Sequence, residues 1–154
     1  MGFWSVFRLD TVSTKPEGCG ASSGLLLSAL MWVSMPRPTI LVIEPHQATR
    51  DLWASVLRSL KCRAIAVATV TDAERALEHV VPDLVITELV LGGVNGTELC
   101  RSLRGDARTS KVPILMITGC PQDPDRAAAG ADVVLGKPLP IRTFAETVRT
   151  LISQ

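Results

Sequence analysis

Short apolar runs that alternate with amphipathic stretches are the feature that most constrains the fold of this chain. The first and third runs are continuous aliphatic segments, TILVI at 39–43 and LVIT at 84–87. Such runs are typical of strands that are covered on both faces. Three further runs predict strands, namely AIAVA at 64–68, PILMIT at 113–118 and DVVLG at 132–136.

Between these runs, apolar residues recur at helical spacing. Thr71 and Glu74 have the spacing of a capping box that begins the second helix, and a third helix is predicted around 96–104. Two apolar stripes predict the first and the last helix; they consist of Leu52, Trp53, Val56, Leu57 and Leu60, and of Ile141, Phe144, Ala145, Val148, Leu151 and Ile152.

This alternation predicts an α/β fold with a doubly wound, five-stranded parallel sheet between two layers of helices. Parallel strands need crossover connections, and right-handed crossovers place helices on both faces of the sheet. In such sheets, ligands bind at the carboxyl ends of the strands.

Four polar side chains follow the predicted strands at that edge. Glu44 ends the first strand, Glu88 the third, Thr118 the fourth, and Lys137 follows the fifth. Taken alone, Glu88 is better explained as the first solvated residue of a loop. The convergence of two carboxylates, a hydroxyl and an ammonium instead predicts a functional pocket.

Composition limits the classes of function. The chain has 154 residues, is 47% hydrophobic and carries a net charge of +1, without a basic run, so we expect no nucleic-acid partner. The four cysteines are scattered without metal-ligand spacing, which indicates free thiols in the cytoplasm. Phosphate-loop, dinucleotide-binding and nucleophile-elbow motifs are absent from the sequence.

Residues 1–37 lack periodicity and are interpreted as a disordered or loosely helical extension, with residues 38–154 as the folded domain. The apolar run 25–33 is too short to span a membrane, which takes about 20 residues. Met35 is an alternative start of the chain, and a cleaved signal peptide is disfavoured by the poor basic flank. Because Gln154 follows the last predicted helix closely, we expect no output domain after it.

Residues 38–154 resemble a response regulator receiver domain of the CheY-like kind, which has a (βα)5 flavodoxin-like fold. The resemblance is carried by four segments: ILVIEPHQATR, PDLVITELVLGGVNGTELCRSLR, VPILMITG and AGADVVLGKPLP. In that family, a histidine kinase passes a phosphoryl group to an aspartate at the end of the third strand. The resemblance implies that Glu88 stands at the phosphoacceptor position, Glu44 in the acidic pocket, and Thr118 and Lys137 at the phosphoryl contacts.

The departures from the family pattern decide the functional hypothesis. The acceptor is Glu88 instead of aspartate, the second acidic residue is Pro45, and Val134 replaces the aromatic residue that accompanies the switch threonine. The extra methylene moves the carboxylate by about 1.5 Å, and a misplacement of about 1 Å can lower a rate a hundredfold. We expect no firmly bound metal and at most a weak Mg²⁺ site at Glu44 and Glu88.

The leading hypothesis is a stand-alone, degenerate receiver that acts in two-component signalling as a protein-interaction module without phosphorylation and is not an enzyme. Its expected partner is a histidine kinase or another signalling protein, without a membrane contact. The prolines at 121 and 124 leave room for only a short fourth helix, so the usual dimerisation face is altered and the oligomeric state stays open. The alternatives are a working phosphoacceptor with unusual chemistry, and an unrelated small α/β ligand-binding domain or enzyme.

Overall fold

A five-stranded parallel sheet forms the centre of the fold in the computed structural model, which describes residues 37–119 and 130–153. The strand order is β2-β1-β3-β6-β7. The strands are β1 (Thr39–Ile43), β2 (Arg63–Val67), β3 (Leu84–Thr87), β6 (Ile114–Thr118) and β7 (Val133–Gly136). All the pairings within this sheet are parallel, so the predicted doubly wound α/β fold is confirmed.

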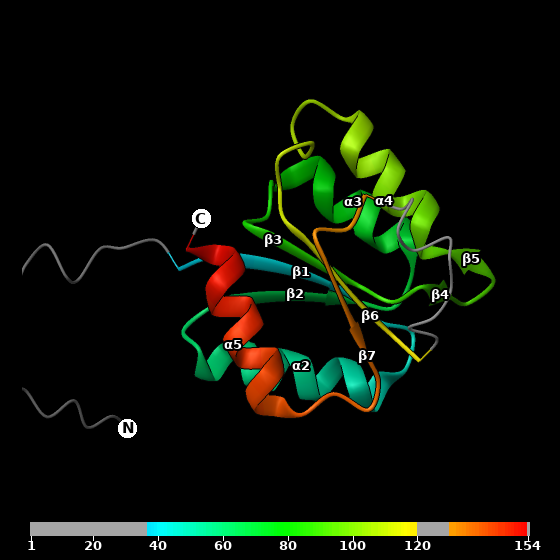
Figure 1. The fold of residues 1–154 in the computed structure, drawn as a ribbon. Coiled ribbons are helices and arrows are strands. Elements are labelled where there is room, and N and C mark those ends of the chain that lie inside the picture. Colours follow the sequence, from blue (N-terminus) through cyan, green and yellow to red (C-terminus); the bar gives the residue numbers. More distant parts are fainter. Residues whose placement is uncertain (1–36, 120–129, 154) are drawn as a thin grey trace, which may run out of the picture. The chain divides into compact units, whose positions relative to one another are not determined.

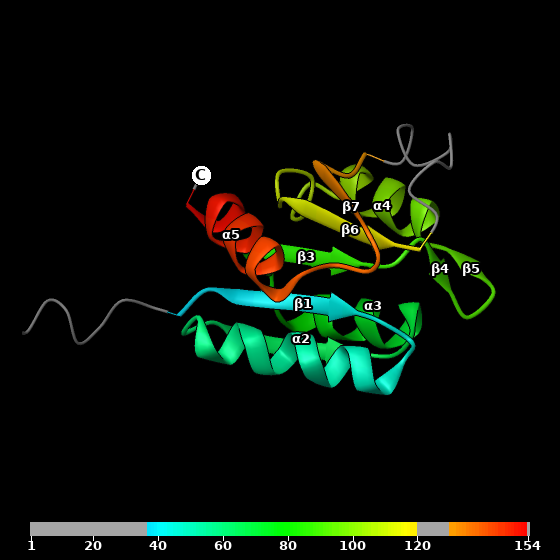
Figure 2. The same ribbon diagram turned by 60° about the horizontal axis from the view of Figure 1, so that its bottom comes forward.

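Helices cover both faces of the sheet (Figures 1 and 2). They are α2 (Gln47–Ser59), α3 (Val70–His79), α4 (Gly96–Gly105) and α5 (Ile141–Ile152). Alternate residues of β1 point to opposite faces, so Leu41 and Ile43 pack with α3 and α4, whereas Ile40 and Val42 pack with α2 and α5. The sheet therefore separates two apolar cores.

The core beneath α2 and α5 is joined by an aromatic pair. Trp53 of α2 and Phe144 of α5 stack with their ring centroids 4.2 Å apart, and both side chains are buried. Offset aromatic pairs contribute about 0.5–1.5 kcal/mol beyond their buried area. The pair therefore helps fix α5, whose first residue lies four positions after Lys137.

Several local predictions were wrong in detail. The side chain of Thr69, not Thr71, caps α3 by accepting a hydrogen bond from the backbone of Asp72, because the helix begins at Val70. Leu52 and Ile141 belong to the predicted apolar stripes but are 42% and 52% exposed, since each lies at the margin of its helix's buried face. The predicted strand at 64–68 is displaced by one residue at both ends from β2, and those at 113–118 and 132–136 begin one residue before β6 and β7.

A small hairpin was not predicted. β4 (Val90–Leu91) and β5 (Val94–Asn95) pair in antiparallel fashion on either side of Gly92 and Gly93. Gly92 and Gly93 have φ angles of 60° and 99°, which glycine adopts without steric cost. The hairpin lies beyond the carboxyl end of β3 (Figure 2).

Two interpretations fall outside the described part of the chain. These are the loosely structured extension up to residue 36 and the shortened fourth helix between residues 120 and 129. Among the residues that are described, no helix has the length and apolar character needed to cross a membrane.

Candidate functional site

The predicted polar residues meet in one pocket at the carboxyl ends of the central strands. The pocket has a volume of about 400 Å³, and Glu44, Glu88, Thr118 and Lys137 all line it. They follow or end β1, β3, β6 and β7, whose parallel registers bring these ends to one edge of the sheet. Pro45, His46, Val90, Gly92 and Gly119 complete the lining.

The ammonium group of Lys137 lies between two carboxylates. Its Nζ is 2.8 Å from Oε2 of Glu44 and 2.6 Å from Oε2 of Glu88. The side chains of the two glutamates are only 7% and 12% exposed, and that of Lys137 is 30% exposed. One positive and two negative charges thus share a partly buried site with a net charge of −1.

Backbone donors hold the second oxygen of each carboxylate. Oε1 of Glu44 accepts a hydrogen bond of 3.0 Å from the backbone N–H of His46, and Oε1 of Glu88 accepts one of 2.8 Å from that of Leu89. Each carboxylate therefore bridges the lysine and a backbone amide. This arrangement fixes both carboxylates against the backbone at the ends of β1 and β3.

The charge state of Lys137 follows from two opposed effects. Burial lowers the pKa of the ammonium group, but the hydrogen bonds and charges of Glu44 and Glu88 outweigh burial, so the pKa is raised above 10.5. Lys137 is therefore protonated at neutral pH, and its charge is held by the two carboxylates.

Two residues that the sequence analysis did not single out position the carboxylates. Arg50 of α2 donates from Nη1 to the carbonyl oxygens of Glu44 (2.7 Å) and Pro45 (3.1 Å), which fixes the turn after β1. A Cβ atom at Gly96 would overlap the carbonyl oxygen of Glu88, so only glycine permits this close approach. An arginine on a predicted helix does not indicate a contact with a loop, so the role of Arg50 could not be predicted from the sequence. A glycine at the start of a helix weakly indicates a close backbone contact, as found for Gly96.

The remaining predicted residues have different locations. Thr118 is 1% exposed and its carbonyl oxygen accepts a hydrogen bond of 2.7 Å from the backbone N–H of Lys137. Val134 does not line the pocket; it packs against the core beneath α3 and α4, because residues of β7 alternate between faces. A further carboxylate, that of Asp83 just before β3, accepts a hydrogen bond from the backbone of Thr39 and does not line the pocket.

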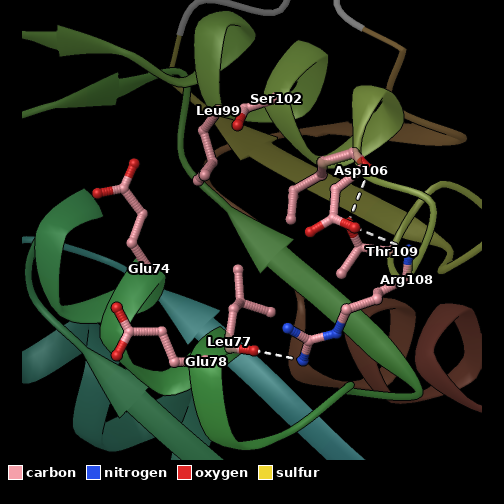
Figure 3. Close-up of a pocket in the computed structure, with 9 residues that line it drawn as sticks. Glu74, Leu77, Glu78, Leu99, Ser102, Asp106, Arg108 and Thr109 are labelled. Carbon is pink, nitrogen blue, oxygen red and sulfur yellow. Dashed lines mark hydrogen bonds between the residues drawn. The ribbon is translucent and has the colours of Figure 1, made fainter.

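A second hollow lies between α3 and α4 (Figure 3), with a volume of about 250 Å³. Its Arg108 guanidinium donates to the carbonyl oxygen of Leu77 at 2.6 Å, and Asp106 accepts a hydrogen bond from the backbone of Arg108. These contacts tie the end of α3 to the loop after α4. The charges of Arg108 and Asp106 are thus explained by these structural contacts.

Comparison with known proteins identifies the family. The sequence profile of the response regulator receiver domain matches residues 40–149, which is more than half of the chain. The chain therefore belongs to the receiver domain family of two-component signalling, whose members are generally signalling modules and not enzymes. The alternative of an unrelated α/β domain is overturned by this match.

Two curated relatives extend the comparison. The chain is 31% identical over 118 residues to the phosphate regulon transcriptional regulatory protein PhoB of Rhizobium meliloti, covering 75% of this chain and 52% of PhoB. It is 33% identical over 121 residues to the DNA-binding dual master transcriptional regulator RpaA of Synechocystis, covering 75% of this chain and 49% of RpaA. The chain thus spans about half the length of these relatives, which are themselves transcriptional regulators.

A solved structure supports the fold. The receiver domain of the sensor histidine kinase PA1611 from Pseudomonas aeruginosa aligns with a TM-score of 0.71 at 24% identity, covering 77% of this chain and all of that one. That protein has a magnesium ion coordinated in its active site cleft.

The donor set of the present pocket does not fit a magnesium ion. All four carboxylate oxygens of Glu44 and Glu88 accept a hydrogen bond or ion pair, two of them from Lys137. Within residues 37–119 and 130–153, no group of three or more His, Cys, Asp or Glu side chains is arranged to hold a metal. Mg²⁺ demands near-ideal octahedral oxygen ligation, which here would require displacement of the ammonium group.

Proposed function

We propose that this receiver domain is a protein-interaction module that works without accepting a phosphoryl group. The observation that carries the proposal is the position of the Lys137 ammonium, 2.8 Å from Glu44 and 2.6 Å from Glu88. Lysine is the residue that the family resemblance assigns to contact with the phosphoryl group. In this structure, the positive charge of Lys137 is balanced by the carboxylates of Glu44 and Glu88 of the same chain.

The replacement of two acidic positions supports the same conclusion. Phosphoryl transfer depends on in-line positioning and on a metal ion that neutralises the oxygens. Glu88 is longer than aspartate by one methylene, and its Oε1 is held by the backbone N–H of Leu89. Pro45 provides neither a carboxylate nor a backbone donor next to Glu44.

Glu88 imitates part of what a phosphorylated aspartate would do. Its Oε2 reaches the ammonium group of Lys137, and Thr118 lines the same pocket. A carboxylate carries a single negative charge, whereas a phosphoryl group carries about −1.5 to −2 at pH 7. We infer that the domain is held in one signalling state, in which a partner reads the surface around the pocket irrespective of phosphodonors.

A mass measurement tests the proposal. The full chain is incubated with acetyl phosphate and Mg²⁺, and its intact mass is compared with that of the matched Glu88→Asp/Pro45→Asp variant, which restores both acidic positions. We expect no gain of mass in the wild-type chain and a labile phosphoryl adduct on the variant. An adduct mapped to Glu88 in the wild-type chain would overturn the proposal and support the alternative of an unusual phosphoacceptor.

A further inference from the structure

A third pocket lies at the opposite, amino-terminal end of the strands, and we name it the arginine hollow. It has a volume of about 650 Å³ and is lined by Arg37, Thr39, Arg58, Cys62, Arg63 and Ala64. Three of these six residues carry a guanidinium group. None of them lines the carboxylate–lysine pocket, so the arginine hollow is a separate site.

The backbone around the arginine hollow is fixed from both sides. Thr39 and Arg63 are register partners of β1 and β2, and the backbone N–H of Arg63 donates to the carbonyl oxygen of Pro38 at 2.8 Å. Arg58 lies in the last turn of α2, and the backbone N–H of Cys62 donates to the carbonyl oxygen of Leu57 at 3.0 Å. Two of the arginines therefore extend from well-anchored backbone.

The arginines of the hollow lack carboxylate partners in the described part of the chain. Arg75, Arg104 and Arg142 each form an ion pair there, whereas no ion pair or side-chain hydrogen bond involves Arg37, Arg58 or Arg63. The nearby carboxylate of Asp83 accepts a hydrogen bond of 2.7 Å from the backbone of Thr39.

Helix electrostatics explain only one of the three charges. A cation in the last turn of a helix is favoured by the helix dipole, which accounts for Arg58. It does not account for Arg37 or Arg63, which lie before β1 and at the start of β2. Like charges that share a hollow repel one another, and an anion placed between them removes that repulsion.

We propose that the arginine hollow binds a ligand that carries two or more linked phosphate groups. Guanidinium groups recognise phosphate through paired, charge-assisted hydrogen bonds, and Thr39, whose side chain carries a hydroxyl group, also lines the hollow. The volume is within the range of about 300–1,000 Å³ that is usual for small-ligand pockets. Because no aromatic side chain lines the hollow, recognition rests on the phosphate groups and not on a stacked ring.

Calorimetric titration of the full chain with sodium pyrophosphate tests this proposal. We expect saturable binding that weakens as sodium chloride is added and that is stronger than binding of orthophosphate. The Arg58→Gln/Arg63→Gln variant should raise the dissociation constant at least about tenfold, or about 1.4 kcal/mol. Both side chains are exposed, so glutamine should leave the fold intact, which circular dichroism checks.

A matched variant separates the site from general charge attraction. Arg101→Gln/Arg142→Gln removes the same charge from exposed positions that do not line the arginine hollow, and it should bind pyrophosphate like the wild-type chain. An equal loss in both double variants would overturn the proposal, as would the absence of binding at millimolar pyrophosphate. Binding of an oligoglutamate peptide in preference to pyrophosphate would likewise overturn the assignment to phosphate.

Discussion

Replacement of Lys137 by methionine should expose the electrostatic role of the pocket. Methionine is one atom shorter than lysine but keeps most of the apolar stem and removes the charge, so Glu44 and Glu88 are left with no cation between them. The two carboxylates are 7% and 12% exposed, so water screens their repulsion only in part.

The magnitude follows from the burial of the ion pairs. Removing one partner of a buried ion pair costs about 3–5 kcal/mol, because the remaining charge stays buried. The side chain of Lys137 is 30% exposed. We therefore expect the lower end of that range, a loss of about 3 kcal/mol in the free energy of unfolding at pH 7.

The pH dependence has a defined sign. Since the pKa of Lys137 is raised above 10.5, its stabilising contribution is fully present below that pH and is lost as the pH rises through the raised pKa. The difference in stability between wild type and Lys137→Met should thus be constant from pH 7 to 9 and decrease above pH 10.5. The Lys137→Met/Glu88→Gln variant should recover part of the loss, because only one of the two carboxylates remains.

Urea denaturation followed by circular dichroism measures these differences. The control is Lys111→Met, which removes a charge from an exposed lysine that forms no ion pair within the described residues. If Lys137→Met and Lys111→Met unfold at the same urea concentration, the two carboxylates do not depend on the lysine and the electrostatic reasoning is refuted.

Two other predictions concern packing and thiol chemistry. Gly96→Ala should destabilise the fold and shift the NMR signals of Glu88, because the new Cβ would overlap the carbonyl oxygen of Glu88. The control is Gly105→Ala in the same helix, whose Cβ would meet nothing within 4 Å and which should be neutral or stabilising. Equal effects of the two substitutions on stability would contradict the predicted clash. Burial raises the pKa of Cys100 to about 11, and this thiol is fully buried, so iodoacetamide at pH 8 should modify Cys100 only as fast as the chain unfolds. Peptide mass spectrometry over time measures the rates, and rapid modification of the folded chain would count against the burial.

Much of the fold could be predicted because strand and helix periods are properties of local sequence. The limits of β1 and β3 were predicted correctly from continuous aliphatic runs. The hairpin β4–β5 was missed, because two strands of two residues each leave no periodic pattern. The apolar stripe of α2 was predicted too wide at Leu52, since spacing alone does not define where a buried face ends.

The pocket was predictable in its location but not in its contacts. Parallel topology alone brings the ends of β1, β3, β6 and β7 together, so the meeting of Glu44, Glu88 and Lys137 in one pocket followed from strand order. The backbone donors at His46 and Leu89 depend on turn geometry, which the sequence does not encode in a simple pattern. The same holds for the arginine hollow, whose three arginines are distributed over a loop, a helix and a strand.

The central claim, that Lys137 is held by Glu44 and Glu88 and the pocket does not accept a phosphoryl group, is tested most directly by NMR. The full, isotopically labelled chain is titrated with Mg²⁺ and then with beryllofluoride, which binds the acceptor carboxylate of competent receivers as a phosphoryl mimic. We predict that the amide signals of Glu88, Thr118 and Lys137 stay in place while the spectrum remains that of a folded domain. Saturable shifts centred on these three residues would show that the pocket holds a phosphoryl-like group and would contradict the claim.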